Sequence, residues 1–354
     1  MDDQALSDLE IVIPNLHWRY SGVTATNRMI APRLARPYHT AWLGRDAPEG
    51  IARLSFGGLL RLRFCPSNRR AARIWHARRN NEMIVGLVLK LFGWKLKLIY
   101  TSAGQRRFSR FTQFLIGRMD EVIATSDAAA SYLRCPATVI LHGVDADVYR
   151  PPADRAASFA GSGLPGKYGI GCFGRVRMQK GTDLFVEAMC RLLPNYPDYT
   201  AIVVGLITPR HRRFAARLLE RVESAGLAGR VRFLGELPID ELPLWYQRIS
   251  IYAFTSRVEG FGLTLLEAEA AGAALVAARA GAAENVVIDR ETGVLVRAGD
   301  VDALVKGLDT LMRDPGKAAA MGARARGRVM AEFNVNVEAA RIAEVYRRSW
   351  ARGR

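Results

Sequence analysis

Two carboxylates eight positions apart flank a glycine loop in the segment Glu259-Gly-Phe-Gly-Leu-Thr-Leu-Leu-Glu267. Small apolar residues follow, so we expect Glu259 in a loop and Glu267 in the first turn of a buried helix. Loop amides and a helix N-terminus then point at one place, where they favour a negatively charged group. Carboxylates beside that group can accept hydrogen bonds from hydroxyls. A ligand with both phosphate and hydroxyl groups indicates a nucleotide sugar.

Spacing alone leaves simpler interpretations open for both carboxylates. Thr264 and Glu267 have the separation of a capping box, in which the glutamate only ties back the start of its helix. Glu259 taken alone also fits a solvated loop residue.

A second segment, Gly174-Arg-Val-Arg-Met-Gln-Lys-Gly181, places Arg175 and Lys180 between an expected strand and an expected helix. Such a loop can bring two cations to a diphosphate, although ordinary surface ion pairs are the alternative. The glycines at 169, 171 and 174 match a dinucleotide-binding pattern, but they fall inside the expected strand. Because that pattern needs a helix to open at its glycines, we reject it here.

Length and composition indicate a folded protein of two domains. The chain has 354 residues, 49% of them hydrophobic and 24% charged. The apolar run at 83–89 is much shorter than the roughly 20 residues that span a bilayer, and residues 1–14 lack the pattern of a secretory signal. We therefore expect a cytoplasmic protein. Four scattered cysteines and five histidines offer no ligand spacing, so we expect neither disulfides nor a metal.

The net charge of +17 is concentrated in one region, because residues 51–118 carry 15 basic residues and one acidic residue, Glu82. These basic residues alternate with large apolar ones, as in Leu59-Leu-Arg-Leu-Arg-Phe64. That mixture favours the surface of an anionic membrane, where apolar side chains enter the headgroup layer and cations meet phosphates. A solvated basic face and a nucleic-acid surface are the alternatives.

Alternating strands and helices in both halves predict two parallel-sheet α/β domains with a cleft between them. We expect a first domain at 1–150, a linker at 151–166, a second domain at 167–335 and a final helix at 336–354. The strands are expected at 9–14, 74–77, 97–101 and 121–124, and then at 169–173, 200–204, 231–234, 249–254, 274–277 and 293–296. Helices in the second half are expected at 182–193, 209–225, 241–246 and 301–312.

The paired glutamates, the Gly174–Gly181 loop and the turn His142-Gly-Val-Asp145 together resemble retaining glycosyltransferase family 4. The resemblance covers residues 140–330 strongly and 9–30 weakly. It implies the GT-B fold, with two facing Rossmann-like domains and a C-terminal helix that crosses back to the first domain. The motif Asp145-Ala-Asp147 falls in the domain-closing turn, so we expect no metal there.

The resemblance also implies roles for individual residues. Glu267 binds ribose hydroxyls, Glu259 and the loop after it hold the sugar, and Arg175 and Lys180 neutralise the leaving diphosphate without a metal or other cofactor. In the first domain Gly22 faces the diphosphate and His76 borders the transferred sugar. The implied donor-binding set comprises Gly22, Gly174, Arg175, Lys180, Gly205, Glu259, Gly260, Phe261, Gly262, Leu263 and Glu267, and the implied catalytic set comprises Arg175, Lys180, Glu259 and His76.

Within the family, residues 167–205, 235–238 and 252–257 look closest to bacterial lipopolysaccharide core mannosyltransferases, which use GDP-mannose. This likeness implies a glycolipid acceptor and a peripheral position on the inner face of the bacterial inner membrane, with no nucleic acid as partner. A family 4 enzyme that uses a UDP-sugar (glucose or N-acetylglucosamine) is the first alternative. A basic nucleic-acid-binding protein without enzymatic activity is the second.

Overall fold

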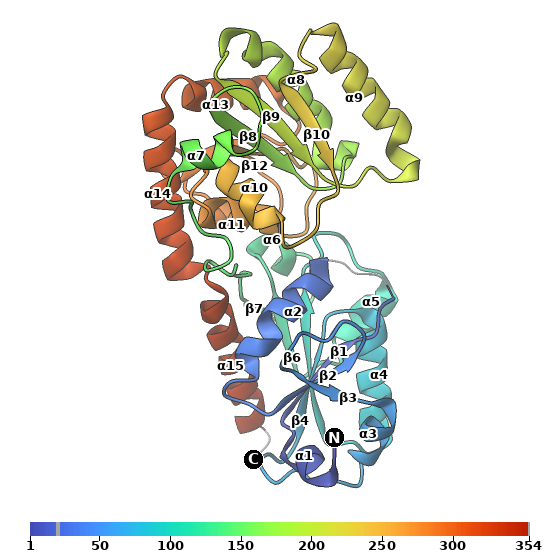
Figure 1. Ribbon diagram of the computed structural model, residues 1–354. Coiled ribbons are helices and arrows are strands. Elements are labelled where there is room, and N and C mark those ends of the chain that lie inside the picture. The colour runs from blue at the N-terminus through green and yellow to red at the C-terminus, as the bar shows by residue number, and fades with distance from the viewer. Residues whose placement is uncertain (19–21, 353–354) are drawn as a thin grey trace. The chain divides into compact units, whose positions relative to one another are not determined.

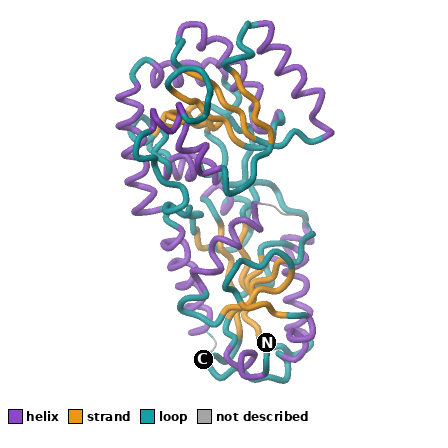
Figure 2. The backbone as a smooth tube through the Cα atoms, in the orientation of Figure 1, coloured by secondary structure: helices purple, strands orange, loops and turns teal. Residues whose placement is uncertain are grey.

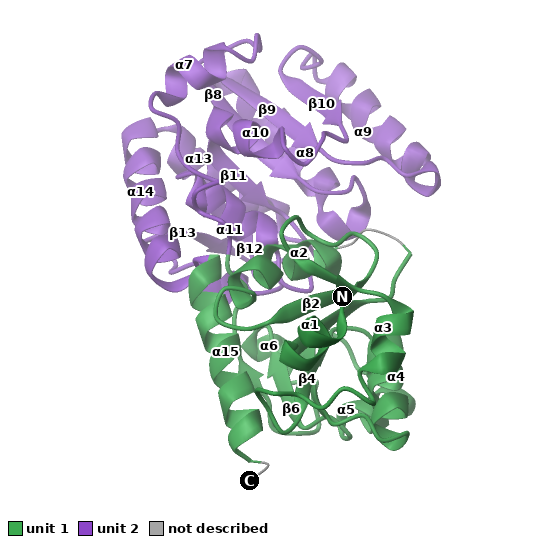
Figure 3. Ribbon diagram, turned by 60° about the horizontal axis from the view of Figure 1, so that its bottom comes forward, with its two compact units in different colours: residues 1–143, 335–354 green, residues 144–334 purple. Residues whose placement is uncertain are grey.

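The computed structural model describes residues 1–18 and 22–352. The chain forms two compact units, one of residues 1–143 and 335–354 and the other of residues 144–334 (Figure 3). Each is an α/β unit whose strands are flanked by helices (Figure 2). Ser21, in the predicted loop before Gly22, lies outside the described residues.

The first unit contains a parallel sheet with the strand order β3-β2-β1-β4-β5-β6-β7 (Figure 1). Its strands are β1 (Ile11–Asn15), β2 (Thr40–Gly44), β3 (Ala52–Leu54), β4 (Arg73–Ala77), β5 (Leu96–Ser102), β6 (Glu121–Ala124) and β7 (Thr138–Val139). Its helices are α1 (Asp3–Asp8), α2 (Gly22–Leu34), α3 (Phe56–Arg61), α4 (Asn80–Leu91), α5 (Arg110–Ile116), α6 (Asp127–Ala130) and α15 (Val335–Ala351).

Both faces of this sheet are buried, because successive strand side chains alternate between two apolar clusters. In β1, Val12 points into the cluster beneath α1, α3, α4 and α5, whereas Ile11 and Ile13 point into the cluster beneath α2 and α15. Ile342 and Tyr346 bring α15 into the second cluster. The last helix therefore belongs to the same core as the first strand.

The second unit contains a parallel sheet with the strand order β10-β9-β8-β11-β12-β13. Its strands are β8 (Tyr168–Phe173), β9 (Tyr199–Val204), β10 (Val231–Gly235), β11 (Ile249–Phe254), β12 (Ala274–Ala278) and β13 (Gly293–Val296). Its helices are α7 (Arg155–Ala160), α8 (Thr182–Leu192), α9 (Arg212–Ser224), α10 (Leu242–Arg248), α11 (Leu263–Ala270), α12 (Ala283–Val286), α13 (Val301–Met312) and α14 (Pro315–Glu332), with short 3-10 turns η1 (Met178–Lys180), η2 (Leu193–Asn195) and η3 (Pro209–His211).

Several elements differ from the sequence-based expectation, and the strands β2, β3 and β7 of the first sheet were not predicted. The predicted linker at 151–166 contains α7, whose start is capped by the Asp154 side chain and whose Phe159 is buried. Helix α14 was not predicted, because it is rich in alanine, arginine and glycine and shows little apolar periodicity. It packs through Met321 and Ala325, and Gly322 lies against the backbone at Gly272. Both segments belong to the core of the second unit.

Candidate active site

The carboxyl ends of β8, β9 and β10 are joined through glycines. The amide of Gly174 donates to the carbonyl of Val204 at 2.8 Å, and the amide of Gly205 donates to the carbonyl of Gly235 at 2.7 Å. Gly205 has a φ of +152°, and a Cβ there would overlap the carbonyl of Gly174. Only glycine combines this backbone conformation with so close an approach. The sequence thereby fixes the loop after β8 against the end of β9.

The loop that carries Lys180 is tied to the loop after β11. The Thr255 hydroxyl donates to the Lys180 carbonyl at 2.9 Å, and the amide of Arg257 donates to the Gln179 carbonyl at 2.8 Å. Gly181, with a φ of +69°, lies so close to Thr255 that a Cβ would overlap its carbonyl. The two loops therefore form one rigid edge.

A bidentate ion pair strengthens this connection. Both terminal nitrogens of Arg257 donate to the Asp183 carboxylate, each at 2.7 Å, and one of them also donates to the Met178 carbonyl at 2.6 Å. The planar guanidinium matches the carboxylate in this geometry. The carboxylate lifts the pKa of Arg257 above its ordinary value. Asp183 lies in the first turn of α8, so the pair also fixes where that helix starts.

Lys180 and Glu259, which are 79 positions apart in the sequence, form an ion pair at this edge. Both side chains are mostly buried. Glu259 also accepts hydrogen bonds from the Ser256 hydroxyl at 3.3 Å and from the Gly260 amide at 3.0 Å. Arg175 lies in the same β8–α8 loop and is exposed. The edge thus holds the paired Lys180 and the exposed Arg175 beside the Glu259 carboxylate.

Gly262 ends the loop and forms the N-cap of α11, with a φ of +99°. The capping box, which spacing left open as an alternative for Thr264 and Glu267, is not present, because the helix starts after Gly262 without any side-chain cap hydrogen bond. Glu267 also lies in the second turn rather than in the first. Its carboxylate instead accepts a hydrogen bond from the Tyr246 hydroxyl at 2.6 Å. Glu267 therefore has a partner from α10 and is not occupied in starting its own helix.

Burial and two tyrosines affect the pKa of Glu267 in opposite directions. Burial raises the pKa of its carboxyl, while hydrogen bonds from Tyr246 and Tyr149 act in the opposite direction. Burial and the adjacent carboxylate raise the pKa of Tyr246 well above its ordinary value. Tyr246 therefore stays a neutral donor, and an incoming hydroxyl would offer Glu267 a further hydrogen bond in the same buried place.

The loop of Gly260, Phe261 and Gly262 is supported by the turn at Gly281. The amide of Ala282 donates to the Phe261 carbonyl at 2.8 Å, and a Cβ at Gly281 would overlap that carbonyl. Phe261 is itself buried. The loop that leads into Leu263 and α11 is thereby held in one conformation. Such rigidity is needed if its backbone amides are to bind a ligand.

In the first unit, His76 has hydrogen-bond partners within the fold, and its predicted contact with a sugar stays a prediction. The imidazole is buried in β4, with Nδ1 2.6 Å from the Tyr346 hydroxyl and Nε2 2.7 Å from the Thr101 hydroxyl. Burial lowers its pKa well below the ordinary value, so the ring is neutral. Because both ring nitrogens have partners, His76 links β4, β5 and α15. Gly22, by contrast, is exposed at the start of α2.

A polar network that the sequence did not predict lies at the carboxyl end of β4. Arg79 donates to the side chains of Asn15 at 2.8 Å, Thr24 at 2.9 Å and Glu82 at 3.0 Å. The neighbouring Arg78 is buried; its amide donates to the Glu82 carboxylate at 2.8 Å, and its guanidinium Nη1 donates to the Thr26 hydroxyl at 3.2 Å. Its Nε and Nη2 have no hydrogen-bond partner among the described residues. Arg78 thus retains donors for an anionic group.

The comparisons agree with this architecture. The family Glycosyl transferases group 1 matches residues 154–328, which include the cation loop and both glutamates. The lipopolysaccharide core biosynthesis mannosyltransferase LpcC of Rhizobium leguminosarum bv. viciae is 46% identical, over 96% of this chain and 97% of its own length. The corresponding enzyme LpsB of Rhizobium meliloti is 43% identical, over 96% and 98%.

Among solved structures, that of Anabaena HepE in complex with UDP and glucose superposes with a TM-score of 0.78. It is 23% identical and covers 95% of this chain and 99% of its own. The fold and the site define a glycosyltransferase with the two Rossmann-like domains of the GT-B fold. The chain belongs to the glycosyl transferases group 1 family, which decides against a non-enzymatic nucleic-acid-binding protein.

Proposed function

We propose that this protein transfers mannose from GDP-mannose to a lipid-linked lipopolysaccharide core acceptor, with retention of the anomeric configuration. The similarity to two lipopolysaccharide core mannosyltransferases, at 46% and 43% identity over nearly the whole chain, supports the sugar and the acceptor class. The observation that carries the donor site is the Lys180–Glu259 ion pair at the edge that leads into α11.

Each group at this edge has a role in the proposed reaction. Lys180 and the exposed Arg175 bind the diphosphate, and Glu259 with the amides after it holds the hydroxyls of the sugar. Glu267 binds the ribose hydroxyls beside Tyr246. Binding of the donor then exchanges the Lys180–Glu259 pair for a Lys180–phosphate pair and leaves Glu259 to accept from the sugar.

The transfer breaks the bond between the anomeric carbon and the diphosphate oxygen and forms a bond from that carbon to an acceptor hydroxyl on the same face. The proton of the hydroxyl passes to the departing phosphate. Lys180, Arg175 and the N-terminus of α11 stabilise the negative charge that develops on the diphosphate. These groups perform the electrostatic task that a metal ion has in other transferases, so we propose a metal-independent reaction.

For the acceptor we propose the carboxyl edge of the first unit. Arg78 follows β4 directly, and the two guanidinium nitrogens that have no hydrogen-bond partner in the described part of the chain suit a phosphate or carboxylate on the acceptor. Burial lowers the pKa of Arg78, because the charged guanidinium is removed from water. An anionic ligand beside it would offset this cost of desolvation.

We further propose that the protein works at the surface of an anionic membrane. Helices α3, α4 and α5 cover one face of the first sheet and share one apolar cluster beneath them (Figure 1). They and the residues that follow them expose large apolar side chains. These are Phe56, Leu60, Phe64, Ile84, Val88, Leu91, Phe92, Phe111 and Phe114.

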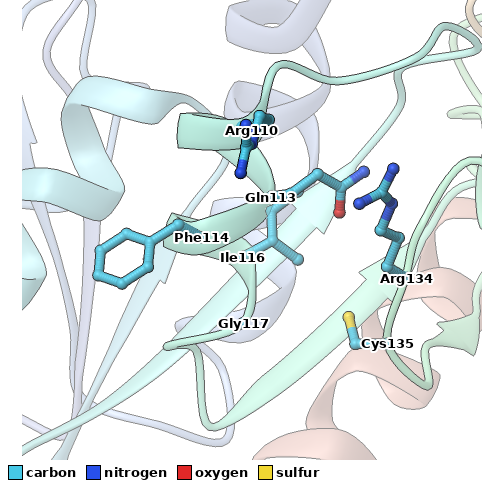
Figure 4. A pocket seen from close by; sticks show the side chains of 7 residues that line it. All are labelled: Arg110, Gln113, Phe114, Ile116, Gly117, Arg134 and Cys135. Atoms are coloured by element: carbon cyan, nitrogen blue, oxygen red, sulfur yellow. The ribbon is translucent and has the colours of Figure 1, made fainter.

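Basic side chains accompany these apolar groups. The Arg118 guanidinium lies over the Phe114 ring at 4.9 Å. Also on α5, Gln113 turns toward Arg134 at a cavity of about 290 Å³ (Figure 4). Apolar groups and cations on one face suit the headgroup layer of a bilayer. Among the described residues, no helix is long and apolar enough to cross a membrane.

The donor assignment is tested by product formation on lipid-linked core acceptors. GDP-mannose, UDP-glucose and UDP-N-acetylglucosamine are supplied in turn to the purified protein. We expect transfer of mannose from GDP-mannose alone. Transfer only from a UDP-sugar would overturn the assignment and favour the alternative donor.

A further inference from the structure

A basic pocket lies at the amino edge of the sheet in the first unit. It has a volume of about 680 Å³. Its lining comes from the residues before β4, the end of α4, the start of β5 and the end of α15. Six of the lining residues are cations, namely Arg69, Arg70, Lys90, Lys95, Lys97 and Arg347.

The walls of the basic pocket are held by two tryptophans. The Trp350 indole donates to the Ala72 carbonyl at 2.9 Å, and the Arg70 guanidinium stacks over its ring at 4.3 Å. The Trp94 indole donates to the Leu59 carbonyl at 2.9 Å. Both indoles are therefore fixed by backbone hydrogen bonds, and the pocket has a defined shape.

The charge of the basic pocket is only partly balanced. Arg70 pairs with Glu10 at 2.7 Å, and Lys90 pairs with Asp120 at 2.8 Å. For Lys95 and Lys97, the described part of the chain contains no ion pair or side-chain hydrogen bond. Among the residues that the structure describes, no acidic side chain lines the cavity. Two ammonium groups thus face it without a counter-charge, which favours an anionic ligand.

The basic pocket is separate from the proposed acceptor edge. All strands of the sheet are parallel, so their amino ends share one edge and their carboxyl ends share the other. Arg73, which begins β4, lies next to the basic pocket, whereas Arg78 follows the opposite end of the strand. A ligand in the basic pocket therefore lies apart from the acceptor hydroxyl that reacts.

Exposed apolar side chains adjoin the basic pocket. Leu91 and Phe92 are 82% and 59% exposed, and they lie between two of its lining residues, Lys90 and Trp94. Binding of a soluble phosphate ligand would not explain why exposed apolar groups lie beside the cations. A bilayer accounts for both features, because Leu91 and Phe92 enter its acyl boundary while phosphates reach the ammonium groups.

We infer that the basic pocket binds the phosphate headgroup of an anionic membrane lipid through Lys95 and Lys97. The bound lipid anchors the first unit to the bilayer by the edge opposite to Arg78, with Leu91 and Phe92 inserted beside it. This inference rests on the proposed function only in that both require a membrane surface.

Vesicle sedimentation tests the inference without donor or acceptor, so its failure is distinguishable from failure of the proposed transfer. The full-length protein is mixed with phosphatidylcholine vesicles that contain or lack phosphatidylglycerol. We expect Lys95→Ala/Lys97→Ala to lower the affinity for phosphatidylglycerol vesicles about tenfold or more, since each basic residue near the surface contributes substantially. Binding to pure phosphatidylcholine should not change.

The matched control removes the same charge from the second unit. Lys306 and Lys317 are exposed on α13 and α14, and Lys306→Ala/Lys317→Ala should change the vesicle affinity less than about threefold. An equal loss in the control would show general charge attraction and overturn the inference. Competition by soluble glycerol phosphate at low millimolar concentration would overturn it in favour of a free phosphate ligand. Binding to duplex DNA is measured for the same variants. If Lys95→Ala/Lys97→Ala lost DNA binding but kept its affinity for phosphatidylglycerol vesicles, the inference would also be contradicted.

Discussion

The carboxyl edges of the two sheets are built in different ways. In the second unit, glycines with positive φ bring backbone against backbone, as at Gly205 and Gly181, and the cations lie on loops fixed by those contacts. In the first unit, Gly44 approaches the Asn15 backbone in the same way, but side chains also form the edge. There Arg79 joins Asn15, Thr24 and Glu82. We infer that the carboxyl edge of the second unit binds features common to nucleotide sugars through its main-chain geometry. The carboxyl edge of the first unit would instead bind one particular acceptor through its side chains.

The largest expected effect concerns the charge at the second edge. Lys180→Ala should lower kcat about 10²- to 10³-fold, because a fixed donor to the developing negative charge is lost. Steady-state kinetics at saturating donor measures this loss. Lys167→Ala is the control, since Lys167 is an exposed lysine of the same unit in a surface pair with Asp198. A kcat for Lys180→Ala within threefold of the control would contradict the role of Lys180.

A substitution at Gly205 tests the backbone contact. Gly205→Ala should lower the free energy of unfolding by about 3 kcal/mol, because it combines a left-handed strain with overlap against Gly174. Chemical denaturation measures the change. Gly226→Ala has a φ of +68° in open space and should cost only about 1 kcal/mol. Equal costs for the two variants would show that the approach of the strand ends is unimportant.

The first edge is tested by a pair of arginines at the two ends of β4. Arg78→Gln should raise the KM for the acceptor about tenfold, because charge-assisted hydrogen bonds are lost, and should leave the KM for the donor unchanged. Arg73 donates to three backbone carbonyls at the other end of the strand. Arg73→Gln should therefore reduce stability without changing either KM. An Arg78 variant that alters the donor KM instead would remove the proposed contrast between the edges.

Much of the second unit follows from its sequence. The expected strands at 249–254 and 293–296 coincide with β11 and β13, because each is a short apolar run between turn residues. The placement of Lys180 and Glu259 in one site depended on the family resemblance, since nothing local joins residues 79 positions apart, and their ion pair was not predicted. The partner of Glu267 was missed for the same reason, because Tyr246 lies on a different helix.

The first unit was less predictable. Its carboxyl edge depends on side-chain contacts that have no local signal. That two nitrogens of Arg78 lack a hydrogen-bond partner within residues 1–18 and 22–352 is visible only in the folded chain. For His76, the resemblance suggested a sugar contact, whereas burial between Thr101 and Tyr346 gives it a packing role. The spacing of residues in the sequence predicts turns and loops, but contacts between side chains that are distant in the sequence can be identified only from the folded structure.

Melting temperatures in the presence of nucleotides test the central claim most directly, because a ligand that binds the native state stabilises it by mass action. We predict that GDP raises the melting temperature of the wild-type protein, that UDP does not, and that Lys180→Ala loses most of the GDP effect. A rise with UDP but not with GDP would contradict the proposed donor. A GDP effect that persists fully in Lys180→Ala would contradict the proposed site.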